Sequence, residues 1–273
     1  MITFLKNLTL VTLIEVKLLS KNLYPMKILV CISSVPDTTT KITFTDNDTQ
    51  LNKQGVQFII NPYDEFSLSK ALKLKAELGG TVTVINVGTA ENDPVIRKSL
   101  AIGADDALRI DVAPIDGMHV ANEIANYAKD KGYDLILTGR ESIDFNGGVV
   151  PHLLGELLGI PSVSPCVNLT VNGSTIELET LIDGGKETLT CSTPAVIGGQ
   201  KGLVLENELI IPNMRGIMQS RTKPLTVATS ASSESAQKVT KLEQPAAKSG
   251  CKIVDAANVD ELVDLLQNEA KVI

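Results

Sequence analysis

Short apolar runs alternate with longer amphipathic segments from Met26 onward, and this alternation constrains the fold more than any other feature. The segments 66–78 and 117–131 carry apolar residues mostly three and four positions apart, which indicates helices. Strands that alternate with helices of this length form a parallel sheet covered on both faces. We therefore predict an α/β fold, doubly wound, with a mostly parallel sheet flanked by helices. The strand-like runs are 26–32, 81–87, 107–110 and 134–137.

The periodicity changes in the second half of the chain. Segments 162–171 and 175–182 alternate polar and apolar residues, and 186–191 alternates again after the turn residues Asp183-Gly184-Gly185. This pattern predicts an antiparallel β-hairpin added to the main sheet. The run 194–199 is a candidate for a further strand of that sheet.

Both ends of the chain differ in composition from its middle. Residues 1–25 hold three lysines and a weak apolar run without a cleavage site, so we expect an upstream extension that is not part of the fold. Residues 26–227 are the expected α/β domain. Residues 228–273 begin with a small, polar linker, and Asn258 is a suitable N-cap for a short amphipathic helix. We expect this arm to dock on another protein, because a lone helix cannot bury its apolar face.

The polar loop after the run 134–137 is the strongest candidate site. It leads into an apolar helical segment at 149–158 through Asn146-Gly147-Gly148. A helix N-terminus offers unpaired N–H groups and a partial positive charge, and glycines allow close backbone approach. Ligands of parallel α/β sheets bind at the carboxyl ends of the strands. The loop is therefore either an anion site, such as a nucleotide phosphate site, or an ordinary strand-to-helix connection.

Composition and missing motifs argue against several functions. A net charge of −7 and 3% aromatic residues disfavour nucleic-acid binding. The four cysteines and two histidines lack metal or disulfide spacing, so we expect no metal and a reducing compartment, the cytoplasm. No dinucleotide fingerprint, P-loop, nucleophile elbow or zinc-protease motif occurs, and no stretch suits direct membrane insertion. We therefore expect ligand binding without catalytic residues. The apolar segment 207–218 is either a partner surface or a loop packed on its own core.

Several short motifs, taken in order and spacing, resemble the beta subunit of electron transfer flavoprotein. The resemblance extends from Met26 to the C-terminal end of the chain. Its carriers are Asn61-Pro62-Tyr63-Asp64-Glu65, Leu100-Ala101-Ile102-Gly103-Ala104-Asp105, Gly139-Arg140-Glu141-Ser142-Ile143-Asp144, Ile182-Asp183-Gly184-Gly185-Lys186-Glu187, Pro194-Ala195-Val196-Ile197, Arg215-Gly216-Ile217-Met218 and Lys223-Pro224-Leu225.

The resemblance implies a heterodimer with an electron transfer flavoprotein alpha subunit. Such a dimer carries electrons from acyl-CoA or other flavin dehydrogenases to a downstream acceptor. It implies that FAD is held mainly by the alpha subunit, that AMP is bound in the beta subunit, and that the arm 228–273 docks on the alpha subunit. Two alternatives remain open: an electron-bifurcating variant with a second FAD in place of AMP, and a standalone adenine-nucleotide sensor.

The resemblance also assigns roles to residues. Cys31 would lie beside the adenine, Val87 beneath the adenosine, and Met214 at the apolar anchor that inserts into a partner dehydrogenase. Thr180 and Gln219 stand where relatives carry basic residues, and the stretch 145–149 replaces their acidic cluster and Asn-Gln. The other nucleotide contacts implied are Asn61, Pro62, Tyr63 and Asp64 around the adenosine, and Gly139, Arg140, Glu141, Ser142, Ile143, Asp144, Phe145, Asn146, Gly147, Gly148, Val149 and Val150 around the phosphate.

Overall fold

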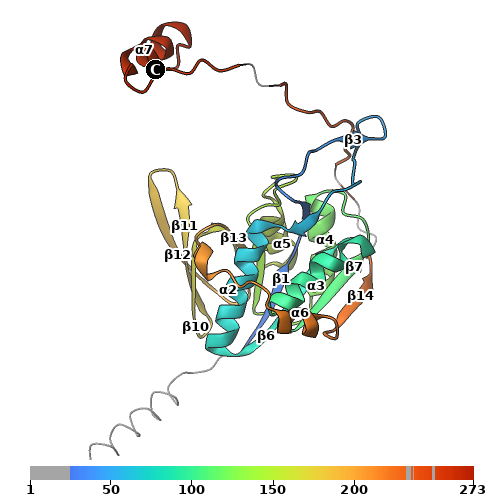
Figure 1. Cartoon of the computed structure of the whole chain (residues 1–273). Coiled ribbons are helices and arrows are strands. Elements are labelled where there is room, and N and C mark those ends of the chain that lie inside the picture. The colour runs from blue at the N-terminus through green and yellow to red at the C-terminus, as the bar shows by residue number, and fades with distance from the viewer. Residues whose placement is uncertain (1–24, 232–234, 236, 248–249) are drawn as a thin grey trace, which may run out of the picture. The chain divides into compact units, whose positions relative to one another are not determined.

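The computed structural model describes residues 25–231, 235, 237–247 and 250–273 (Figure 1). The extension predicted at 1–25 lies outside this part of the chain except for its last residue, and Met26 begins the first strand. Contacts divide the chain into two units. The larger unit combines the segment up to Thr43 with 52–239, and the smaller unit combines Phe44–Leu51 with 240–273.

The larger unit is built on a seven-stranded sheet in which every neighbouring pair of strands is parallel (Figure 1). The expected doubly wound α/β fold is therefore confirmed. The run 194–199 does return to this sheet as its sixth strand in spatial order. That order is β14 (Leu225–Thr229), β7 (Asp106–Asp111), β6 (Gly80–Val87), β1 (Met26–Cys31), β8 (Leu135–Gly139), β13 (Ala195–Gly199) and β9 (Ser162–Cys166).

Helices cover both faces of the sheet, because successive side chains of its inner strands point to opposite sides and are apolar on both. In β1, Ile28 and Val30 belong to one core cluster, and Leu29 and Cys31 belong to the other. Helices α2 and α3 supply the first cluster, while α4 and α5 supply the second. Their bounds are α2 (Pro62–Leu78), α3 (Asp93–Ile102), α4 (Gly117–Ala128) and α5 (Val150–Leu158).

The predicted hairpin is present, but its expected first segment is divided between two sheets. Strands β11 (Thr175–Ile182) and β12 (Gly185–Ser192) pair antiparallel, and β10 (Asn168–Asn172) pairs with β11. The first half of the segment expected at 162–171 is instead β9, which lies parallel to β13. The prediction of one continuous hairpin segment was wrong here, because alternation alone does not specify the partner strand.

Two apolar stretches near the end of the larger unit also differ from expectation. Residues 207–218 contain the start of a short helix, α6 (Met214–Ser220), which is capped by the Asn213 side chain accepting the N–H of Gly216 at 2.8 Å. Strand β14 continues past residue 228, where a linker was expected to begin. The remaining short elements of this unit are β2 (Ser34–Pro36), β5 (Phe58–Ile60), η1 (Ala90–Asn92) and η2 (Glu206–Glu208).

The smaller unit contains a hairpin of β3 (Phe44–Thr45) and β4 (Gln50–Leu51) and a C-terminal helix. Helix α7 (Val259–Asp264) follows Asn258, as expected, and continues into a π-helical turn, η3 (Leu265–Glu269). The Asn258 side chain donates to Glu261 at 2.6 Å rather than capping the helix. Within the described residues, no helix is both long and apolar enough to cross a membrane.

Candidate functional site

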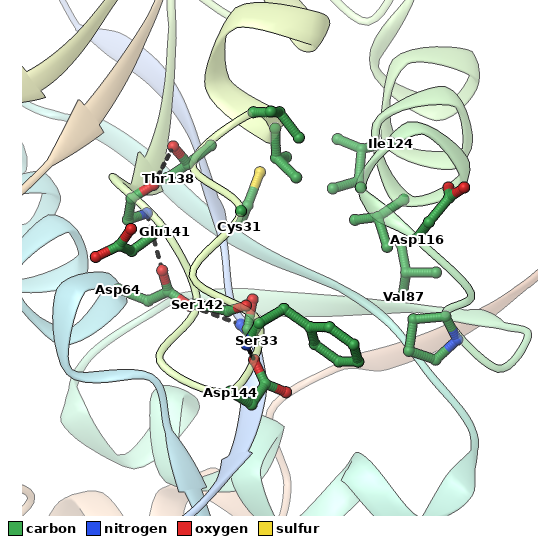
Figure 2. Close-up of a pocket in the computed structure, with 18 of the residues that line it drawn as sticks. Cys31, Ser33, Asp64, Val87, Asp116, Ile124, Thr138, Glu141, Ser142 and Asp144 are labelled. Atoms are coloured by element: carbon green, nitrogen blue, oxygen red, sulfur yellow. Dashed lines mark hydrogen bonds between the residues drawn. The ribbon is translucent and has the colours of Figure 1, made fainter. Parts of the chain in front are cut away.

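A cavity of about 480 Å³ lies at the carboxyl ends of β1, β6 and β8 (Figure 2). The chain places β6 and β7 on one side of β1, and then returns to place β8 and β13 on the other side. The strand order therefore reverses beside β1. Open α/β sheets bind their ligands at such a reversal, outside the carboxyl ends of the strands.

Most of the residues predicted to contact a nucleotide line this cavity. Asn61, Pro62, Tyr63, Ile143 and Asn146 are not among its lining residues. Contact with a nucleotide stays a prediction for the whole set. The predicted residues that line the cavity are Cys31, Asp64, Val87, Gly139, Arg140, Glu141, Ser142, Asp144, Phe145, Gly147, Gly148, Val149 and Val150.

Asp64 joins the ends of β1 and β8 from the first turn of α2. Its Oδ2 accepts the N–H of Ser33 at 2.7 Å, and its Oδ1 accepts the N–H of Gly139 at 2.8 Å and the Asn61 amide at 3.0 Å (Figure 2). Burial raises the pKa of Asp64 to about 7, although these three hydrogen bonds lower it. The carboxyl group therefore holds two strand ends in place at the floor of the cavity.

Asn61 supports the same loop from outside the cavity. Its Nδ2 also donates to the carbonyl oxygen of Glu141 at 2.8 Å, and its Oδ1 accepts the N–H of Ile143 at 3.2 Å. Both ends of the amide are thus used within the protein, which is the usual condition for a buried polar side chain. Asn61 therefore holds the backbone of the loop that leads into α5.

The loop enters α5 with several N–H groups that have no partner in the part of the chain that the structure describes. Asn146 and Gly148 adopt left-handed conformations with φ of 50° and 63°, which Asn and Gly accommodate most readily. Within the described residues, no acceptor is found for the N–H groups of residues 147–150, and no side chain caps α5. All four residues line the cavity. Unpaired N–H groups at a helix N-terminus are suited to bind an anion.

The N-terminus of α4 forms the wall next to this loop. Asp116 caps α4 by accepting the N–H of His119 at 2.7 Å. Gly117 lies so close to Val149 that a Cβ atom at residue 117 would be 2.8 Å from the Val149 side chain. The first turns of α4 and α5 are therefore neighbours at one end of the cavity.

The middle of the cavity is apolar. Figure 2 shows Cys31 between the loop residue Glu141 on one side and Val87 and Ile124 on the other. A wall of this kind is suited to a flat, weakly polar group such as a purine base.

Part of the cavity wall could not be recognised from the sequence. Asp116 is recognisable in the sequence as an N-cap residue before a helix. Only the packing of α4 against α5 places Asp116 near Val149. Segment 237–239 was assigned to the linker and has no sequence signal for this position. The missed lining residues include Asn86, Asn92, Pro114, Ile115, Asp116, Gly117, Val120, Ile124, Thr138, Gln237, Lys238 and Val239.

The cysteines are expected to differ sharply in reactivity. Burial raises the pKa of the Cys31 thiol far above its ordinary value and that of Cys166 to about 11, whereas Cys251 is exposed. Because the thiolate is the reactive form, we expect iodoacetamide at pH 8 to modify Cys251 at least about 100-fold faster than Cys31 or Cys166. Timed alkylation of the native protein, followed by peptide mass mapping, measures these rates. Equal rates at Cys31 and Cys251 would contradict the buried position of Cys31.

Met214, the predicted partner anchor, begins α6 and is 74% exposed. Helix α6 is fastened to α3, because the Arg97 guanidinium donates to the carbonyl oxygens of Ser220 and Lys223 at 2.7 Å each. Lys223 in turn donates to the carbonyl oxygen of Leu100 at 2.9 Å. Ile217 and Met218 of the same helix are exposed as well, and a group of exposed apolar side chains is typical of a partner surface.

Comparison with known proteins gives one consistent family. The family described as electron transfer flavoprotein domain matches residues 48–233 of this chain. The electron transfer flavoprotein subunit beta of Bacillus subtilis (strain 168) is 34% identical over 262 residues, which cover 91% of this chain and 100% of the relative. The subunit beta of Syntrophomonas wolfei is 33% identical over 253 residues, covering 90% and 98%. That of Bradyrhizobium diazoefficiens is 31% identical over 257 residues, covering 91% and 100%.

Proposed function

Since the chain belongs to the family of electron transfer flavoprotein beta subunits, we propose that its cavity binds AMP and that it works in a heterodimer with an alpha subunit. In this proposal the beta subunit helps to enclose an FAD held mainly by the alpha subunit. The dimer carries electrons in the cytoplasm from acyl-CoA or other flavin dehydrogenases to a downstream acceptor. The chain contributes binding and positioning, without catalytic residues of its own.

One observation carries the AMP proposal: the N–H groups of residues 147–150, at the N-terminus of α5, have no acceptor among the described residues. A phosphate placed there accepts these N–H groups and lies at the positive end of the helix dipole. The adenine then fits the apolar middle of the cavity beside Cys31, with Val87 and Ile124 opposite the loop. The fit rests on the chemistry of the walls, since a phosphate and a purine need different surroundings and this cavity offers both.

Counting the bound nucleotides tests the proposal. We expect the heterodimer purified from its native source to be yellow and to release one FAD and one AMP per dimer on acid denaturation, measured by chromatography of the supernatant. Two FAD molecules and no AMP would instead identify the electron-bifurcating variant. A stable single chain that binds an adenine nucleotide and no flavin-containing partner would identify a standalone sensor. Absence of any adenine nucleotide would refute the site.

The proposed anchor can be tested by truncating its side chain. We expect Met214→Ala to slow dehydrogenase-driven reduction of the heterodimer about tenfold or more, because an exposed side chain buried only on docking contributes chiefly to the complex. The unfolding free energy should change by less than about 0.5 kcal/mol. Stopped-flow reduction by a purified partner dehydrogenase measures the rate.

Leu205→Ala is a matched control for this substitution. Leu205 is also an exposed apolar residue, 60% accessible, but it lies outside α6. Its truncation should leave the reduction rate unchanged. An equal slowing by both substitutions would argue against a specific anchor at Met214.

A further inference from the structure

Residues Gln237, Lys238 and Val239 form part of the cavity wall, although they follow the last strand of the sheet by several residues. Their contribution brings the C-terminal part of the larger unit into the candidate site. The hydrogen bond that holds them there comes from Asp116, the N-cap of α4, and the first turns of α4 are themselves a wall of the cavity.

Two carboxylates, one in α4 and one at its N-cap, accept hydrogen bonds from residues beyond β14. Glu123 is only 1% exposed, and it accepts the hydroxyl of Ser230 at 3.0 Å and the N–H of Ala231 at 2.8 Å. Asp116 uses one oxygen to cap α4 and the other to accept the N–H of Gln237 at 2.7 Å. Residue 237 is thereby held at the N-terminus of α4.

This end of α4 adjoins the unpaired N–H groups of the loop. Gly117, the residue after Asp116, packs against Val149, whose own N–H is one of those groups. Lys238 follows Gln237 directly and lines the same cavity. The chain therefore carries a lysine to the end of the cavity where the first turns of α4 and α5 meet.

The charges of the cavity wall single out this lysine. Among the residues that the structure describes, four carboxyl groups line the cavity, those of Asp64, Asp116, Glu141 and Asp144, and two basic side chains do so, Arg140 and Lys238. The Arg140 guanidinium is already engaged, since it pairs with Glu141 at 3.1 Å and donates to Gln200 at 3.0 Å. No ion pair is found for Lys238 among the residues that the structure places.

We propose that Lys238 binds the phosphate of the adenine nucleotide held by residues 147–150, so that residues 237–239 complete the nucleotide site. This inference rests on the proposed AMP site. A phosphate dianion in a cavity with four carboxyl groups needs a compensating cation, and the compact ammonium group of lysine serves as a point charge for phosphate. The carboxylates of Asp116 and Glu123 position the lysine through the hydrogen bonds that they accept from Gln237, Ser230 and Ala231.

Comparing the binding of AMP with the binding of adenosine tests the role of the Lys238 charge directly. We expect Lys238→Gln to weaken AMP binding about tenfold, the scale of one charge-assisted hydrogen bond, and to leave adenosine binding unchanged within about twofold. Calorimetric titration of the full-length protein, freed of bound nucleotide, with AMP and separately with adenosine measures both constants. The loss should shrink at high salt, because an accessible ion pair is screened.

Lys241→Gln is the matched control, because it removes the same charge from a lysine that pairs with Glu243 and does not line the cavity. It should change neither affinity. Unchanged AMP affinity in Lys238→Gln, or an equal loss for AMP and adenosine, would overturn the role of Lys238 while leaving the AMP site intact. An unsubstituted protein that binds no AMP would overturn the proposed function itself, and the role of Lys238 with it.

Discussion

Replacing Asp64 with alanine is expected to lower the free energy of unfolding by about 3–5 kcal/mol, because three donors around this buried carboxyl group lose their acceptor at once. These donors are the N–H groups of Ser33 and Gly139 and the amide of Asn61. The substitution should also abolish AMP binding, since the ends of β1 and β8 are no longer held together. Urea unfolding followed by circular dichroism measures the first effect, and calorimetric titration with AMP measures the second.

The pH dependence of Asp64→Asn gives a second test of the same residue. Burial raises the pKa of Asp64 from 3.8 to about 7 in the folded protein. A carboxyl group with a raised folded pKa adds stability that is complete below the unfolded pKa and is lost as the pH rises through the folded pKa. We therefore expect wild type to lose stability relative to Asp64→Asn between pH 4 and pH 7.

Asp144→Asn is the control, because Asp144 is exposed on the loop that Asp64 supports. The substitution removes a carboxylate from the same loop without touching the hydrogen bonds of Asp64. Parallel curves for wild type and Asp64→Asn across this range would show that the Asp64 carboxyl stays ionised throughout.

Gly139→Ala is expected to cost about 3 kcal/mol of stability, at the upper end of the range for overpacking a dense interior. A Cβ atom at this position would lie 2.3 Å from Oδ1 of Asp64 and 2.8 Å from Cβ of Tyr63. The added methyl group therefore displaces the carboxylate that holds the loop. Urea unfolding at pH 7 measures the loss.

Gly147→Ala provides the comparison within the same loop. A Cβ atom at residue 147 would meet no atom within 4 Å, so its effect on stability should stay within about 0.5–1 kcal/mol. If both substitutions destabilised the protein equally, the close packing of residue 139 against α2 would not be the cause.

The central sheet and the main loop were predictable because each has a local pattern. The runs 26–32 and 134–137 are apolar on both faces, and Gly139 marks the point where β8 ends. Such patterns follow from burial, which every residue of an inner strand experiences. Segment 162–171 was misassigned because its alternation suits either sheet, and only packing against β13 directs its first half to the larger one.

The cavity was only partly predictable, because position in a motif does not specify orientation. Asn61 belongs to a motif expected around the adenosine, yet its side chain faces the back of the loop. The wall at 237–239 depends on a hydrogen bond between residues 121 positions apart, Asp116 and Gln237. No local pattern encodes that contact, since it forms only after α4 and β14 have packed on the sheet.

The hydrogen bonds of Asp64 also set the order in which the site can arise during synthesis. They join residues 31 and 75 positions apart, so the floor of the cavity cannot close until the ribosome has released β8. Domains fold as units during translation, and contacts distant in sequence form late. A nascent chain that ends before residue 139 thus has no cavity floor, and a nucleotide gives it no help in folding. Ligand binding then stabilises only chains whose synthesis has passed this point, which favours finished subunits over truncated ones.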